Sequence, residues 1–324
     1  MTTDGDGDAV EDGRSAVVDA DVRSDAEDGD GVLPAVAAVE RALARPVPAT
    51  ASSRETAVDG VREAIRAAGD VDADASADDV AVAFSGGVDS ALVAALVDAP
   101  CYVVGFPESH DVAAARSAAR AMDVDLNVVE LDLDALAAAV PRVARAIGRT
   151  DAMSVQIALP LFLVAERVAT DGYGHLAVGQ GADELFGGYA KVAKAPTDPR
   201  VDADTVVGAR DEMLRTLPDQ LDRDVRALAA AGVDPVAPLL DGHVVDAARA
   251  LPAHCLVSDR GERKFALRLA AREWVPDSVA FREKKAVQYG SLVGRELDRL
   301  ARRAGFKRRQ DDHVTRYVES RLAE

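Results

Sequence analysis

Short apolar runs alternate with longer stretches of helical periodicity through the middle of the chain. Short apolar runs predict four strands, at 80–84, 101–106, 126–132 and 175–179. The segments between them place apolar residues at helical spacing, as in 91–97 and 111–122. Strands that alternate with helices in this way predict an α/β fold, with a parallel sheet covered by helices on both faces.

The two ends of the chain have different patterns. Apolar residues recur at helical spacing over 33–44 and 56–68, and the chain reads as helical almost throughout beyond Arg200. Residues 1–30 hold eleven acidic residues and two arginines, with no apolar periodicity, which is typical of disorder. The predicted organisation is a disordered acidic tail at 1–32, N-terminal helices at 33–70, a main domain at 71–305 and a C-terminal tail helix at 306–324.

Charge narrows the classes of partner. The net charge of −18 argues against non-specific binding of nucleic acid and against adhesion to anionic membranes. Only six of the 38 basic residues are lysines, so most of the charged surface is built from Asp, Glu and Arg. That composition suits concentrated salt, where the Debye length falls to about 3 Å at 1 M. A halophilic cytoplasm is the hypothesis, and an ordinary acidic soluble protein is the alternative.

Cysteine usage and hydropathy predict a soluble, cytoplasmic protein. Cys101 and Cys255 form no CxxC and no metal-binding spacing, so they read as small buried hydrophobic residues. The chain has no run of 18 or more apolar residues and no basic-then-apolar signal pattern at its N-terminus.

The sequence Ser-Gly-Gly-Val-Asp-Ser at 85–90 lies between a predicted strand and a predicted helix. It lacks the lysine of a Walker A loop and the spacing of a dinucleotide fingerprint. Adjacent glycines let backbone N–H groups point into one concavity beside the positive end of a helix. The turn therefore predicts a phosphate chain with Mg²⁺ as its ligand, with a plain glycine turn as the alternative.

A second motif, "AVGQGADELFGGYAKVAKAP" at 177–196, begins where a predicted strand ends. Because the carboxyl ends of parallel strands meet at one edge of a sheet, Asp89 and Asp183 are expected on neighbouring loops. Two such carboxylates can hold one Mg²⁺ while the phosphate ligand supplies the remaining oxygens. The alternative is that Asp183 and Glu184 only cap the following helix.

Both motifs resemble known ones. The first resembles the pyrophosphate loop of the enzymes that cleave ATP between its α and β phosphates, and the second resembles a stretch of the asparagine synthetases. Resemblance to that family covers roughly 56–300 and includes segments at 103–122, 230–241 and 262–290. It implies an adenine nucleotide α-hydrolase-like fold of the pyrophosphate-loop type, with ATP and Mg²⁺ as cofactors.

The resemblance also implies roles for single residues. Lys284 would steady negative charge at the α-phosphate, although a solvated basic turn is the alternative for that segment. Catalytic positions are expected at Lys284 and Gln180, and metal ligands at Asp89 and Asp183. The residues expected to bind ATP and pyrophosphate are Ser85, Gly86, Gly87, Asp89, Ser90, Gly179 and, through the backbone near the adenine, Val104 and Gly105.

Three departures from the family affect what can be carried over. The family has a glutaminase domain with a cysteine after the initiating Met, where this chain has Thr2 and an acidic tail. Gln180 stands where the family has Glu, and Val236 stands where it has Arg. A neutral amide at Gln180 can hydrogen-bond but cannot act as a base near pH 7.

The expected function is that of an ATP-dependent amide ligase. It would adenylate a carboxylate, with aspartate as the first guess, release pyrophosphate and then transfer ammonia. Free ammonia is the expected nitrogen source unless a separate glutaminase subunit binds. Two alternatives stay open: another acceptor (a different amide ligase or a nucleobase modifier), or a non-catalytic nucleotide-binding relative. Thiolation is disfavoured because the two cysteines are far apart in sequence.

Overall fold

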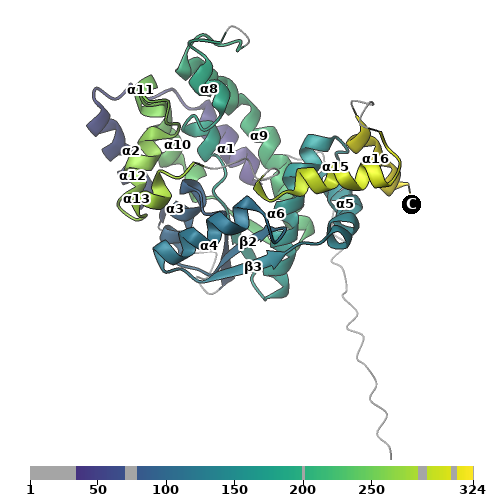
Figure 1. Ribbon diagram of the computed structural model, residues 1–324. Helices are drawn as coiled ribbons and strands as arrows, with labels where there is room; N and C mark the ends of the chain where they lie inside the picture. The colour runs from purple at the N-terminus through teal and green to yellow at the C-terminus, as the bar shows by residue number, and fades with distance from the viewer. Residues whose placement is uncertain (1–33, 70–78, 199–200, 284–289, 308–311, 324) are drawn as a thin grey trace, which may run out of the picture. The chain divides into compact units, whose positions relative to one another are not determined.

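The computed structural model describes residues 34–69, 79–198, 201–283, 290–307 and 312–323 (Figure 1). All of these fall within one compact unit. The predicted acidic tail, most of the polar loop before residue 80, and Lys284 lie outside the described residues.

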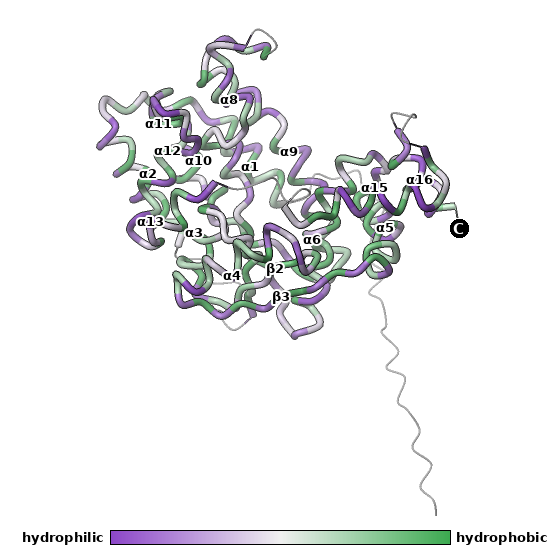
Figure 2. Tube along the Cα trace, in the orientation of Figure 1, coloured by the Kyte–Doolittle hydropathy of each residue, from purple (hydrophilic) through white to green (hydrophobic). Residues whose placement is uncertain are grey.

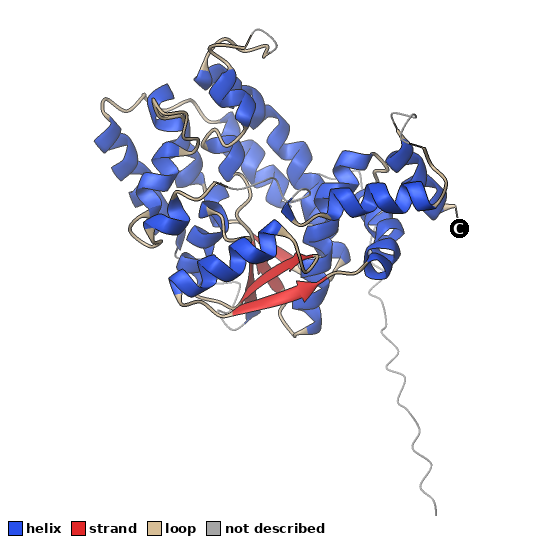
Figure 3. Cartoon of the chain, viewed as in Figure 1, coloured by secondary structure: helices blue, strands red, loops and turns tan. Residues whose placement is uncertain are grey.

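A five-stranded parallel sheet forms the centre of the fold, in the order β3-β2-β1-β4-β5 (Figure 3). Its strands are β1 Val80–Ala83, β2 Cys101–Gly105, β3 Leu126–Glu130, β4 His175–Ala177 and β5 Asp234–Val236. The first four lie inside the runs that the sequence predicted. The predicted α/β class with a parallel sheet is therefore confirmed.

Helices make up most of the remaining structure. Those before β4 are α1 Pro34–Ala44, α2 Arg54–Gly69, α3 Val88–Val97, α4 His110–Met122, α5 Leu133–Ile147 and α6 Ala152–Thr170. Those after it are α7 Ala182–Leu185, α8 Ala190–Lys194, α9 Val206–Ala230, α10 Gly242–Arg249, α11 Ala253–Leu256, α12 Phe265–Ala271, α13 Asp277–Ala280, α15 Val293–Arg303 and α16 His313–Leu322, together with the short helix η2 Pro238–Leu240.

Side chains alternate between two cores along each buried strand. In β1, Val80 and Val82 join a cluster with α2, α3 and α4, whereas Ala81 joins a second cluster with α5 and α6. Val103 and Val104 of β2 divide in the same way. Successive side chains of a strand point to opposite faces, so this alternation shows that helices cover both faces of the sheet.

Helix α6 is long and apolar enough to cross a membrane by length and composition, the one such helix in the described part of the chain. It packs against α5, α9 and β2, and residues such as Val155, Leu159 and Phe162 are buried in the second core. Packing inside the protein accounts for its apolar sequence. A surface helix such as α15 instead alternates apolar and polar residues along its trace (Figure 2).

The fifth strand corrects the expectation that the chain is helical almost throughout beyond Arg200. Asp234–Val236 pairs with β4, and the N–H of Val178 donates to the carbonyl of Val236 at 2.8 Å. The strand has three residues, one of them Pro235, so it carries no strand periodicity in the sequence. A proline is tolerated here because the strand lies at the edge of the sheet.

The terminal helices pack onto the main domain. Helix α2 contacts α10 and α12, α1 contacts α9, and α16 contacts α5 and α15. The amphipathic pattern at the C-terminal end corresponds to α16, which buries Val314, Tyr317 and Val318. The division at residues 70 and 305 stays a prediction.

The order of the strands reverses at β1, which is where open α/β sheets have their ligand-binding crevice. The chain moves outward from β1 to β2 and β3, then returns to the other side of β1 with β4. Ligands of open α/β sheets bind at such a reversal, outside the carboxyl ends of the strands. Asp79 fixes β4 beside β1, because its carboxylate accepts from the N–H of Gly174 at 2.6 Å and contacts Nδ1 of His175 at 3.0 Å.

Candidate active site

The turn after β1 is closed by the hydroxyl group of Ser90. Its Oγ accepts from the N–H of Ser85 at 3.2 Å and donates to the carbonyl of Gly87 at 3.3 Å. Helix α3 begins at Val88, three residues before the predicted helical stretch 91–97, because Gly87 is extended and takes the N-cap position. The first N–H groups of a helix have no partner within it, and no side chain caps this one. The start of α3 can therefore accept an anion.

Only glycine fits at position 86. Gly86 has φ +73°, a conformation that residues with a Cβ rarely adopt. A Cβ there would lie 2.7 Å from both the carbonyl carbon and the carbonyl oxygen of Ala114 in α4. The turn at 85–90, here called the phosphate-loop candidate, is therefore packed against the backbone of α4. This contact fixes the course of the turn.

The loop after β4 lies against the start of α3. A Cβ at Gly179 would lie 2.9 Å from the Cβ of Asp89 and 3.2 Å from the backbone N of Ser90. Gly181 follows with φ +83° and begins the single turn α7, which carries Asp183. The structure thus brings the two predicted motifs into contact, and Asp89 and Asp183 share one partner.

That partner is Lys264, which the sequence prediction did not select. Its Nζ lies 2.6 Å from Oδ2 of Asp89 and 2.8 Å from Oδ1 of Asp183, and the residue is 7% exposed. Lys264 itself has φ +56° and directly precedes α12. A Cβ at Gly188 would clash with both Asp183 and the Lys264 side chain, so this glycine leaves the space that the pair occupies.

The two carboxylates keep Lys264 charged. Burial alone lowers the pKa of the lysine, but the negative charges of Asp183 and Asp89 outweigh it, and the pKa lies above its ordinary value. A signal for this residue was present in the sequence, because lysine is scarce and five of the six lysines lie in or beside the motif segments. Sequence position alone could not tell which of the five faces the carboxylates.

The residues present fit a magnesium ion that is shared with a nucleotide. Oδ1 of Asp89 is buried and accepts no hydrogen bond from the residues that the structure describes. Within those residues no group of three or more Asp, Glu, His or Cys side chains gathers as a metal site. Mg²⁺ is often held by one or two carboxylates together with substrate phosphates, and Asp89 and Asp183 supply that number.

Gln180 and Glu184 lie on either side of Asp183 in the sequence and have different partners. Glu184 is buried, accepts from the Oη of Tyr189 at 2.5 Å, and has a pKa raised by burial. Gln180 donates from Nε2 to Oδ2 of Asp224 in α9 at 2.6 Å. The sequence did not indicate Asp224, because nothing in the local pattern of α9 marks a residue that faces the site.

The two predicted adenine contacts differ in their hydrogen bonding. Pairing of β2 with β1 ends at Tyr102, whose carbonyl accepts from the N–H of Phe84 at 2.7 Å. Two residues on, the backbone of Val104 points to the same side, beyond the end of β1. The carbonyl of Gly105 points the other way and accepts from the N–H of Leu131 at 3.0 Å. Val104 therefore offers backbone groups toward the crevice, and Gly105 does not offer its carbonyl.

Lys284 lies outside the described residues, so its predicted role stays a prediction. Described residues before and after it contact α4 and the end of β2. Arg282 donates to the carbonyl of Ala114 in α4 at 2.7 Å, and the carbonyl of Ser291 accepts from the N–H of Phe106 at 3.3 Å.

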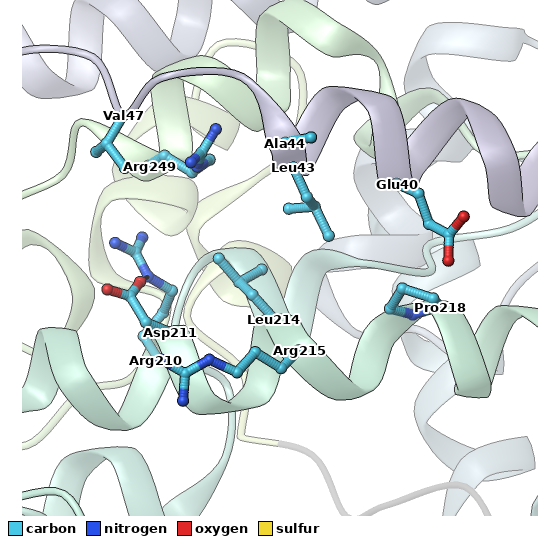
Figure 4. A pocket seen from close by; sticks show the side chains of 10 residues that line it. All are labelled: Glu40, Leu43, Ala44, Val47, Arg210, Asp211, Leu214, Arg215, Pro218 and Arg249. Atoms are coloured by element: carbon cyan, nitrogen blue, oxygen red, sulfur yellow. Dashed lines mark hydrogen bonds and ion pairs between the residues drawn. The ribbon is translucent and has the colours of Figure 1, made fainter.

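A pocket of about 460 Å³ lies elsewhere, between α1 and α9 (Figure 4). Its lining residues include Leu43, Leu214 and Arg210, and none of the predicted site residues. Arg210 is buried and donates to the carbonyl of Ala248 at 2.8 Å, so it ties α9 to α10. This pocket is distinct from the contacts that surround Asp89.

Comparison with known proteins agrees with the geometry. The family model for asparagine synthase matches residues 60–212 and 199–320. The chain therefore belongs to the asparagine synthase family, and the resemblance of its motifs is confirmed.

Three relatives show how far the similarity extends. A Methanocaldococcus jannaschii protein with the provisional name asparagine synthetase [glutamine-hydrolyzing] 1 is 29% identical over 268 residues, which cover 72% of this chain and 49% of the relative. Escherichia coli asparagine synthetase B is 26% identical over 233 residues, covering 66% and 41%. The Asparagus officinalis asparagine synthetase is 26% identical over 237 residues, covering 66% and 39%. The chain thus spans less than half the length of these relatives.

Proposed function

We propose that this protein is an ATP-dependent amide ligase that adenylates a carboxylate, releases pyrophosphate and transfers ammonia to the acyl-adenylate. The contact of Asp89 and Asp183 with one lysine carries the proposal. Asp89 and Asp183 lie in the first turns of α3 and α7, the helices that follow β1 and β4 on either side of the strand-order reversal. Aspartate is the first candidate acceptor, because the relatives are named for asparagine synthesis.

Each part of the chain has a separate task in this proposal. The turn from Ser85 to Ser90 and the start of α3 bind the phosphates through N–H groups and the positive end of the helix. The backbone of Val104 borders the adenine. Asp89 and Asp183 would hold Mg²⁺, which when bound lowers the negative charge of the triphosphate.

Lys264 supports the charge balance of this site. A buried ammonium beside two carboxylates holds them in place while no cation is bound. Asp89 and Asp183 would hold the metal ion, and Nζ of Lys264 beside them would contact an anionic oxygen of the nucleotide, where charge develops as the α-phosphate is attacked. The family resemblance gives that last role to Lys284, and the two lysines can share it.

The acceptor defines the second candidate function. Gln180 carries an amide at a position where the resemblance to the family implies Glu. Its Nε2 donates to the buried Asp224. That difference favours an acceptor other than aspartate as the alternative. A nucleotide-binding relative without catalysis is the third candidate.

We further propose that the enzyme works in a salt-rich cytoplasm and uses free ammonia, or ammonia from a separate glutaminase partner. The direct test incubates the purified chain with ATP, Mg²⁺, aspartate and ¹⁵N-ammonium in high KCl. Labelled asparagine, AMP and pyrophosphate in equal amounts are expected. The same reaction with glutamine in place of ammonium is expected to yield no asparagine. AMP without asparagine would move the proposal to a different acceptor, and no AMP with any amino acid would reject catalysis.

A further inference from the structure

Asp224 is a buried carboxylate at the edge of the site. It is 6% exposed and lies near the end of α9. Its Oδ1 accepts from Nε of Arg223 at 2.7 Å, and its Oδ2 accepts from Nε2 of Gln180 at 2.6 Å. Burial raises its pKa, while the charge and hydrogen bond of Arg223, the hydrogen bond from Gln180 and the more distant charge of Arg149 lower it. Each oxygen thus has one specific donor.

Gln180 is fixed between two constrained glycines. Gly179 lies against Asp89, and Gly181 has φ +83° and no room for a Cβ beside Leu240. The backbone on both sides of Gln180 is therefore fixed, with Gly179 packed against Asp89, and the Gln180 carboxamide contacts Asp224. Since Nε2 is committed to Asp224, the acceptor atom Oε1 is the polar group left for a ligand. No described residue donates a hydrogen bond to it.

We propose that Asp224 is a positioning residue that orients the Gln180 carboxamide, so that Oε1 accepts a hydrogen bond from the incoming nitrogen nucleophile. The nucleophile then belongs to the class that carries N–H donors, ammonia or a primary amine. This inference rests on the proposed function and assigns the nucleophile side of the same site. A carboxylate that accepts from the amide N–H also polarises the amide and makes Oε1 a better acceptor.

The pair has two consequences for substitution. Gln180→Glu alone would bring two carboxylates to a contact of 2.6 Å, so one must take up a proton or move away. Asp224→Asn has a subtler effect. Arg223 donates only, so it retains the Asn oxygen, and the Asn nitrogen then faces Gln180. The Gln180 amide must turn over, which presents Nε2 instead of Oε1 to the nucleophile.

The double variant, Gln180→Glu with Asp224→Asn, exchanges the two functional groups, with the carboxylate at position 180 and the amide at position 224. It restores a hydrogen bond between the two side chains. The Asn nitrogen donates to one oxygen of the new carboxylate, and its other oxygen again accepts from the nucleophile. A structural role for Asp224 alone gives no reason for the double variant to recover nucleophile binding. The comparison of single and double variants therefore separates positioning from stability.

The experiment measures urea unfolding, KM for ammonia, kcat and pyrophosphate–ATP exchange in the wild type, both single variants and the double variant. Asp222→Asn is the matched control, since Asp222 is on the same helix and pairs with Arg226 near the surface. Asp224→Asn is expected to raise KM for ammonia roughly five- to tenfold, the value of one hydrogen bond, with exchange changed less than about twofold. Gln180→Glu is expected to lower the folding equilibrium constant roughly tenfold or more, and the double variant to recover both quantities.

An unchanged KM in Asp224→Asn would overturn the inference. So would a double variant whose KM ratio is the product of the two single ratios and whose loss of unfolding free energy is the sum of the two single losses. If Asp224→Asn does not fold, the KM and the stability of the double variant provide the test. If either fails to return toward the wild-type value, the positioning role of Asp224 is rejected. Absence of exchange in the wild type would instead reject the proposed function. The unfolding measurements would still test the Gln180–Asp224 contact in that case.

Discussion

The ammonium of Lys264 lies 2.6 Å from the carboxylate of Asp89, although 175 positions separate the two residues in the chain. The same ammonium contacts Asp183 at 2.8 Å. One side chain therefore links the loop after β1, the loop after β4 and the segment before α12. This contact places one positive charge between the two carboxylates.

Replacing Lys264 with Met is expected to destabilise the ligand-free protein by about 3 kcal/mol, because two neighbouring carboxylates lose their shared cation. Mg²⁺ should then raise the unfolding temperature of the variant more than that of the wild type, since it no longer competes with the ammonium. Calorimetry with and without MgCl₂ measures both effects. Lys191→Met, at an exposed position in α8, is the control. Equal magnesium shifts in wild type and variant would show that Lys264 does not compete for this site.

Gly86→Ala is expected to cost about 2 kcal/mol or more, since the position has φ +73° and a Cβ would meet backbone atoms of Ala114. Binding of ATP should weaken with it, because the loop must move away from α4. Gly60→Ala is the matched control: this helical glycine has no atom within 4 Å of a built Cβ and should gain up to about 1 kcal/mol. Urea unfolding of both variants gives the comparison. A Gly86→Ala variant as stable as wild type would contradict the close approach of α4.

Asp79→Asn tests the bond between β1 and β4. The N–H of Gly174 donates to Asp79, and with the smaller contribution of His175 it holds the pKa of that carboxyl below its ordinary value of 3.8. A lowered pKa in the folded state contributes stability that is present above pH 3.8 and is lost as the pH falls through the folded pKa.

Wild type should therefore unfold at a higher temperature than Asp79→Asn between pH 5 and 7. In that range a carboxyl group whose pKa is lowered by folding is ionised and contributes its full stabilisation. The difference should shrink steadily below about pH 4. Asp59→Asn, in a pair within one helix turn, is the control. A difference that stays constant down to about pH 2.5 would mean that the Asp79 contact does not depend on its charge.

The sequence was sufficient for four of the five strands but not for all of the site. Short apolar runs predicted four strands, most clearly β1 and β2, which are buried along most of their length. The edge strand that contains Pro235 was missed, because three residues with a proline carry no periodicity. Asp89 and Asp183 were predicted as neighbours from the rule that parallel strands end at one edge. Lys264 and Asp224 could not be placed, because their contacts depend on how α12 and α9 pack against elements far away in the sequence.

Pyrophosphate–ATP exchange tests the central claim most directly, because it reports adenylation without requiring the nitrogen donor. The wild type, Asp89→Asn and Asp183→Asn are compared across a panel of amino acids in high KCl, with Asp59→Asn as control and circular dichroism to verify folding. We expect exchange that depends on one carboxylic acid, unchanged in the control and reduced roughly a hundredfold or more in the two site variants. Exchange that persists in either folded site variant, or no exchange with any acid, would contradict an ATP site built from these two loops.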